Sequence, residues 1–578
     1  MRLDISILDA ATNHPLPCRL SFHGETIPPI WGKDAGGRDM VYQGPPRLWC
    51  DGHWEGELPD LPLTLIVARP YEYATATIQI EPASECRLEI SLQRRCNLPA
   101  AGWHCGDAHQ HVVHGEALLQ VDLSVAAAVA RAEGMDWMVF DGRFTSLPGA
   151  EEPSPSELDR LCAESSRPHF LALWADEYPK HDLGHLACFP FGQTAHPAEI
   201  AGEGIYRLEE QPRTPYATFE SIRTLQRHGT TAVYVHPPRE LGGTPGRVGN
   251  IARELPLDLL VAPWAIEAID LMTDRIDDPI LWEMWHMLLN QGYRIGLCAF
   301  NDACFDRAGG KWSEPVAYRR TYVHIDGEPN WRNLVAAIRA GRTFGTTGPL
   351  LLFDIDGEFP GQIFPADGTE RTVRIRAWGA PSYHDPTEFG SITRVAIIRN
   401  GEIWKECDFT DSPREIVELE FPVAEDATAW YVARVEGSVE KQLAVTSPIY
   451  FEGSDYRTPE PYPIRIRARI SDAHTGAPLS GKMELIEFAK DRIDVVETRE
   501  FHNGEFSGEI PGDLRLHAVV DGYESQTLSP ILDCEPIYRD LLGGIQGPDL
   551  ADPDYYARLR RALNDVELHF PLLPQKES

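Results

Sequence analysis

Short runs in which apolar and polar residues alternate open the chain. LDISIL at 3–8 and ATIQI at 76–80 follow the two-residue period of a half-buried strand. Pro- and Gly-rich turns separate such runs as far as residue 96. The pattern predicts a small β-sandwich over residues 1–96.

A second passage with the same pattern begins far along the chain. IRIRARI at 464–470 leads into SDAHTGAPL at 471–479, and this passage parallels ISILDAATNHPLP at 5–17. Both passages resemble the immunoglobulin-like or carboxypeptidase-regulatory-like sandwich modules attached to many hydrolases. A further sandwich is therefore expected over 457–545.

Between these passages the pattern changes to short apolar strands that alternate with helical stretches. Strands are predicted at 103–107, 136–140, 170–174, 231–235 and 293–300, and helices at 121–134, 215–229, 279–292 and 331–340. Such alternation is typical of a layered α/β domain. We place this domain at 97–350 and expect the chemistry there.

Strand patterns return after the α/β domain. TVRIRAW at 372–378 and RVAII at 394–398 alternate again, and an Asn-Gly turn follows at 400–401. These patterns predict a third sandwich over 351–456. The remaining segment, 546–578, is expected to be a helical tail with one helix at 555–564. The predicted class is multidomain, α/β plus all-β.

Composition excludes some partners. The net charge of −35, from 53 Lys and Arg against 88 Asp and Glu, repels phosphate backbones and anionic lipids. Nucleic acid and membranes are therefore not expected partners. The eleven cysteines form no CxxC pair, and no run approaches the roughly 18 apolar residues of a membrane helix. Without a signal-like N-terminus, the chain is expected to be soluble and cytoplasmic, with reduced thiols.

Histidines are concentrated in one part of the α/β domain. Ten of the twenty lie between His104 and His236. The sharpest element is GDAHQH at 106–111, where His109 and His111 follow an apolar strand directly. Two imidazoles at i and i+2 of an extended segment can bind the same ion. Two solvent-exposed loop histidines are the alternative.

Other ligand-type residues also follow apolar strands. Glu177 ends one strand and His185 opens the next, while His236 and Asp302 each stand at the exit of another. Each residue alone is weak evidence, but together they place ligands at successive strand exits. A carboxylate such as Glu177 can bridge two ions because its two oxygens serve both. We therefore predict a metal centre.

These motifs resemble a known family. GDxHxH at 106–111, EY at 177–178, GHL at 184–186, YVHP at 234–237, NDA at 301–303 and GRTFGTTGPLL at 341–351 resemble those of the CehA/McbA-type (carbaryl-hydrolase-like) metallohydrolases of the PHP (polymerase and histidinol phosphatase) superfamily. The resemblance covers about 103–361. It implies a distorted PHP-type (β/α) barrel with metals at the C-terminal ends of its strands. It also implies hydrolysis, in named members of carbamate esters.

The resemblance also implies a ligand set of two groups joined by a bridge. One ion would bind His109, His111 and Asp302, a second would bind His185 and His236, and Glu177 would bridge them. Zinc, manganese and iron all suit these nitrogen and oxygen donors.

The chain departs from the superfamily at two positions. Gly142 follows Asp141 where a histidine is common, and Cys304 stands where an Asp-x-His pattern would end. A third metal is therefore not expected, and Cys304 is interpreted as a structural thiol.

The implied mechanism uses water activated by one or two divalent ions. Glu177 and Asp302 would act in the centre, and His114, Tyr178 and Arg320 are candidates for orienting the substrate or protonating the leaving group. An ester, carbamate or amide in a small-molecule or glycan-type substrate is the first hypothesis. Phosphoester hydrolysis is the second, and a non-catalytic metal- or carbohydrate-binding protein with a degraded core is the third.

Overall fold

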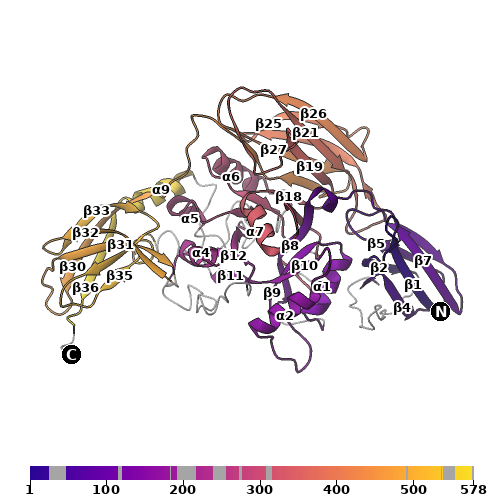
Figure 1. The fold of residues 1–578 in the computed structure, drawn as a ribbon, viewed down its shortest axis with the longest axis horizontal. Helices are drawn as coiled ribbons and strands as arrows, with labels where there is room; N and C mark the ends of the chain where they lie inside the picture. The colour runs from indigo at the N-terminus through magenta and orange to yellow at the C-terminus, as the bar shows by residue number, and fades with distance from the viewer. Residues whose placement is uncertain are drawn as a thin grey trace.

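The protein, seen in a computed structural model, consists of sheet-rich units around a central unit that carries most of the helices (Figure 1). The N-terminal and C-terminal modules lie at opposite ends, and a third set of strands covers the central unit between them. The prediction of several domains, many of them β-sandwiches, is confirmed. The structure describes residues 1–24, 47–114, 120–181, 184–191, 216–237, 255–272, 276–306, 315–489, 492–534, 537 and 553–575.

The N-terminal module is a sandwich of two sheets with strand orders β4-β1-β7 and β3-β2-β5-β6. Leu3, Ile5 and Ile7 of β1 are fully buried, whereas the residues between them are partly exposed, as a strand with one core face requires. Its strands are β1 (Arg2–Asp9), β2 (Cys18–His23), β3 (Arg47–Cys50), β4 (His53–Glu57), β5 (Leu63–Ala68), β6 (Ala76–Ile80) and β7 (Glu85–Leu92).

The C-terminal module repeats this topology, with strand orders β33-β30-β36 and β32-β31-β34-β35. β30 pairs in parallel with β36, as β1 does with β7. In each module the aspartate that ends the first strand accepts a tyrosine hydroxyl: Asp9 from Tyr73 at 2.6 Å, and Asp472 from Tyr523 at 2.8 Å. The strands are β30 (Pro463–Asp472), β31 (Gly481–Ala489), β32 (Arg492–Phe501), β33 (Glu505–Pro511), β34 (Arg515–Val519), β35 (Gln526–Leu528) and β36 (Val566–Leu572).

The predicted helical tail at 546–578 needs a correction. Helix α9 (Pro553–Leu563) is present, but strand β36 follows it directly. Buried and exposed residues alternate along β36, which is the two-residue period of a strand on a core. The tail therefore completes the C-terminal module instead of forming a unit of its own.

Two sheets build the central unit. β8, β9 and β10 are parallel in the first, and β13, β14 and β15 are parallel in the second. The strands are β8 (Trp103–Val113), β9 (Trp137–Gly142), β10 (Leu171–Trp174), β11 (Asp176–His181), β12 (Gly184–Phe189), β13 (Thr231–Tyr234), β14 (Ala268–Asp270), β15 (Gly296–Cys298), β16 (Ala303–Cys304), β17 (Arg320–His324) and β18 (Thr343–Thr346). The helices are η1 (Pro99–Ala101), α1 (Leu123–Ala132), α2 (Pro155–Ser165), α4 (Thr218–Arg227), α5 (Leu255–Val261), α6 (Pro279–Asn290) and α7 (Trp331–Arg339). None of the described helices has the length and apolar composition that crossing a lipid bilayer requires.

The first of these sheets continues past the predicted domain boundary at residue 350. β18 pairs with β28, so that backbone hydrogen bonds join the central unit to the third set of strands. Twelve described strands belong to this sheet, and a separate sheet has the order β19-β21-β26. The third set comprises β19 (Leu350–Ile355), β20 (Ile363–Pro365), β21 (Arg371–Trp378), β22 (Ala380–Pro381), β23 (Phe389–Gly390), β24 (Ile392–Arg399), β25 (Glu402–Asp408), β26 (Ile416–Val423), β27 (Ala429–Gly437), β28 (Leu443–Thr446) and β29 (Ile449–Glu452).

Candidate metal centre

Strand β8 carries two of the candidate ligands. It runs on to Val113, six residues beyond the predicted end, so His109 and His111 lie within the strand and not after it. Residues at i and i+2 of a strand share one face, and both imidazoles are buried. Gly106 is required earlier in the strand, because a Cβ there would collide with the Trp137 ring. Close packing against β9 thus fixes where the two imidazoles lie.

Glu177 and His185 come from the hairpin of β11 and β12. Glu177 pairs in register with Ala187, which brings its carboxylate beside the start of β12. His185 Nδ1 lies 2.6 Å from Glu177 Oε1. The Glu177 side chain is buried, whereas 16% of the His185 side chain is exposed. His185 therefore lies on the solvent side of this pair.

His236 and Asp302 follow strands β13 and β15, and both have unusual backbone conformations. Their φ angles are +34° and +50°, in the left-handed region that few residues other than glycine adopt. Such conformations persist where surrounding contacts enforce them, and they concentrate at functional sites. The backbone thus turns sharply at each of these two ligand positions.

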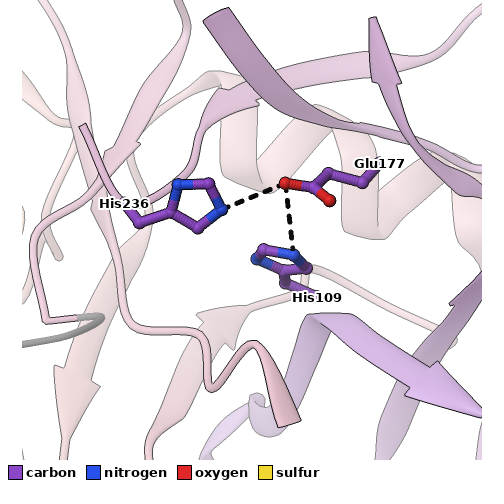
Figure 2. A group of neighbouring side chains, drawn as sticks. All are labelled: His109, Glu177 and His236. Carbon is purple, nitrogen blue, oxygen red and sulfur yellow. Dashed lines mark hydrogen bonds and ion pairs between the residues drawn. The ribbon is translucent and has the colours of Figure 1, made fainter. Parts of the chain in front are cut away.

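The candidate ligands meet in two overlapping groups. His109, His111 and Asp302 form one, in which Asp302 Oδ1 lies 3.3 Å from His109 Nε2 and 3.1 Å from His111 Nε2. His109, Glu177 and His236 form the other, and Figure 2 shows these three side chains pointing toward one another. Glu177 Oε1 lies 3.7 Å from His109 Nε2 and 3.0 Å from His236 Nε2. His109 is common to both groups, a sharing that the sequence did not predict.

The charges of the centre are strongly coupled. Burial opposes the charged form of His109, but Asp302 and Glu177 outweigh burial and raise the His109 pKa to about 9. The pKa of His111 is also raised, because Asp141 and Asp302 outweigh its burial. Burial would raise the pKa of Glu177, yet the imidazoles of His185 and His109 hold that pKa well below its usual range. Any cation bound here must displace protons from imidazole nitrogens, so its affinity falls as pH falls.

The donor atoms fit a divalent metal. Among the described residues, neither ring nitrogen of His109 has a hydrogen-bond partner although both are buried, and the same is true of His236 Nδ1. Leaving buried polar atoms unpaired costs roughly 1–3 kcal/mol each. A cation between the imidazole nitrogens and the carboxylates would satisfy His109 Nε2 and offset the negative charge of Glu177 and Asp302.

Not every predicted site residue joins the centre. The predicted role of Arg320 in orienting the substrate needs a correction. Its guanidinium is fully buried and donates to the backbone carbonyls of Ala317, Pro70 and Glu133, so that it stabilises the fold. His114 is exposed at the edge of the centre, with its ring 4.9 Å from the ring of His111.

Tyr178 lies on β11 next to Glu177, and its side chain is outside the described residues. Its predicted role stays a prediction.

The structure adds residues that the sequence did not single out. Asp141 contacts His111 Nδ1 and so directs Nε2 of that ring toward Asp302. Asp107 accepts the backbone N–H groups of both His109 and Asn301, the residue directly before Asp302. Asp107 and Asn301 lie inside the motifs GDxHxH and NDA, so the sequence contained a signal for both. Asp141 stood out in the sequence only because glycine, and not histidine, follows it.

Cys304 is the remaining residue of interest at this edge. Burial raises the pKa of its thiol to about 12, so the thiol is protonated at neutral pH. Among the described residues, Cys304 belongs to neither candidate ligand group, and its interpretation as a structural thiol stays a prediction.

Comparison with known proteins adds little. No family model and no curated protein matches the chain. Solved structures that match include BcpA, the major pilin subunit of Bacillus cereus, at 13% identity over 30% of this chain and 60% of that chain, with a TM-score of 0.11. They also include the pilus 2b backbone protein of group B streptococcus, at 10% identity over 39% of this chain and 98% of that chain, with a TM-score of 0.13. TM-scores this low carry no argument about this chain.

Proposed function

We propose that this chain is a metal-dependent hydrolase with a PHP-type centre that cleaves an ester, carbamate or amide bond. The observation that carries the proposal is the convergence of six ligand-type side chains from five separate segments. They are His109, His111, Glu177, His185, His236 and Asp302. Chance seldom brings four imidazoles and two carboxylates together in a buried place where imidazole nitrogens lack hydrogen-bond partners.

The two groups suggest how cations would be held. His109, His111 and Asp302 would bind one ion. Glu177 and His236 of the second group, together with His185 beside Glu177, would bind the other. Zinc, manganese and iron each suit imidazole and carboxylate donors. Bound there, such cations supply hydroxide near neutral pH and polarise the oxygen of the bond to be cleaved.

Neighbouring residues support the chemistry. The Asp141 carboxylate at His111 Nδ1 fixes the ring and the nitrogen that it presents to the centre. His114, exposed at the rim, is the described side chain best placed to donate a proton to a leaving group. The low exposure of the ligands, 2% or less for the side chains of His109, His111 and Glu177, keeps bulk water away from them.

The class of bond follows from the motifs. They resemble the CehA/McbA branch of the PHP superfamily, whose named members cleave carbamate esters. Gly142 and Cys304 replace the histidines of a third metal site, and centres with three metals suit phosphate better than centres with two. Phosphoester hydrolysis is therefore the competing outcome of a substrate screen.

Metal analysis with a substrate screen tests this proposal. Protein purified without chelator is analysed for metals and assayed on aryl esters, carbamates and phosphate esters, together with Glu177→Ala and the control Glu164→Ala. Glu164 lies on the exposed face of α2, where it pairs with Arg160. Wild type and control should contain two metals per chain and hydrolyse a substrate, whereas Glu177→Ala should lose activity. No bound metal, or full activity in Glu177→Ala, would contradict the proposal.

A further inference from the structure

Asp107 connects the strand of the first ligand group to the segment that carries Asp302. Its carboxylate is fully buried on β8, two residues before His109. Oδ1 accepts the backbone N–H of His109 at 2.8 Å, and Oδ2 accepts the side-chain amide of Gln110 at 2.7 Å. Oδ2 also accepts two donors from Asn301, its backbone N–H at 3.0 Å and its side-chain amide at 2.5 Å. One carboxylate thus joins two segments far apart in the sequence.

Asn301 is held from a second side as well. Its Oδ1 accepts the backbone N–H of Arg319 at 2.8 Å, and its side-chain amide donates to the Arg319 carbonyl at 2.8 Å. Arg319 directly precedes β17, which pairs with β8. The amide of Asn301 therefore lies fixed between β8 and the start of β17. The next residue is Asp302, whose left-handed backbone needs such enforcement.

We propose that Asp107 and Asn301 form a clamp that sets the Asp302 carboxylate against His109 and His111. Neither residue of the clamp belongs to the candidate ligand groups, so both are positioning residues. This inference rests on the proposed function, because it treats those groups as metal sites. It adds that the clamp governs the position of Asp302, which belongs to one group only, and leaves Glu177 and His236 in place.

The selectivity follows from where the hydrogen bonds go. Within the described part of the chain, the hydrogen bonds of Asp107 and Asn301 reach β8 and Arg319 but neither Glu177 nor His236. Glu177 depends on the β11–β12 hairpin, and His236 follows β13. Loosening the clamp should therefore displace Asp302, while Glu177 and His236 keep their positions. His109, which both groups share, stays within β8 because that strand pairs with β9 and β17.

Asp107→Asn is the direct test. The substitution is isosteric, but an NH2 group replaces one carboxylate oxygen. That group cannot accept the hydrogen bonds that the oxygen accepts in wild type. Metal-free protein is titrated with Co²⁺, and visible absorption reports each ion as it binds. Wild type should bind two ions. Asp107→Asn should bind one with wild-type affinity and the other about 10- to 100-fold more weakly, the usual effect of losing a partner that orients a ligand.

A control removes a comparable carboxylate that also accepts a backbone N–H of β8 but comes from Asp136, directly before β9. Asp136 Oδ2 accepts the backbone N–H of Cys105 at 3.0 Å, and only 12% of the Asp136 side chain is exposed. Asp136→Asn should bind two Co²⁺ ions with wild-type affinities. If Asp107→Asn does not fold, Asn301→Ala breaks the same clamp from its other side and should show the same selective loss.

The outcomes separate the clamp from the proposed function. Two ions bound by Asp107→Asn with wild-type affinities would overturn the clamp and leave the metal centre standing. Equal weakening of both ions in a folded variant would overturn its selectivity. A wild-type protein that binds no Co²⁺ would overturn both the clamp and the metal centre.

Discussion

Replacing Glu220 with glutamine should weaken the contact between α4 and the C-terminal module. Glu220 accepts Arg515 Nε and Nη2, each at 2.6 Å, and also the backbone N–H of Ala217 at 2.9 Å. Only 1% of the Glu220 side chain and 12% of the Arg515 side chain are exposed. Glu220→Gln removes the carboxylate that pairs with the buried Arg515 guanidinium.

The magnitude follows from this burial. Removing one partner of a buried ion pair costs roughly 3–5 kcal/mol, because the remaining charge stays buried and loses the attraction that compensated for its desolvation. Arg515→Met should cost a similar amount by isolating Glu220. The double variant leaves neither charge buried, so it should lose at least about 2 kcal/mol less than the sum of the single losses.

Hydrogen exchange of the α4 amides measures the loss locally, without requiring the whole chain to unfold in one step. A loss of about 3 kcal/mol corresponds to roughly 150-fold faster exchange. The control is Arg467→Met, which breaks the exposed pair of Arg467 and Asp565 and should change protection by less than about 1 kcal/mol. Additive losses in the double variant would refute the argument that the pair acts as a unit.

Three further predictions concern single side chains. Gly106→Ala should destabilise the protein by about 1–3 kcal/mol in thermal unfolding, because the new methyl group overlaps both the ring and the backbone carbonyl of Trp137. Hydrogen bonds from the Thr475 backbone and from the Tyr523 hydroxyl lower the pKa of Asp472 from 3.8 to about 2. The Asp472 carboxylate therefore stabilises the fold above about pH 4, and this stabilisation is lost as pH falls through 2. Tyr523→Phe should raise the pKa of Asp472 in an NMR titration. Cys304→Ala should leave the metal content unchanged in elemental analysis, and a lost ion would show that Cys304 is a ligand.

The sequence predicted the residues of the centre better than their arrangement. His109 and His111 were recognisable because an HxH pattern beside an apolar strand has few other uses. Their sharing between two groups depends on how β8 and β11 approach each other, which local pattern does not encode. Asp141 acts through a contact with His111, and such tertiary partners leave no periodic signal.

The errors have physical causes as well. The sequence offers Arg320 as a candidate for orienting the substrate, yet its buried guanidinium donates to three backbone carbonyls. The strand at 566–572 was missed because a helix precedes it directly and its partner, β30, lies about a hundred residues earlier. Long-range pairing of this kind is decided by the tertiary fold.

The late position of β36 has a consequence for synthesis on the ribosome. β30 cannot gain its parallel neighbour until residue 572 has left the exit tunnel, although residues 463–528 of the module emerge much earlier. The same module provides Arg515, which holds the helix leading to β13 and His236. Assembly of the candidate metal centre should therefore follow the emergence of residue 572 from the ribosome.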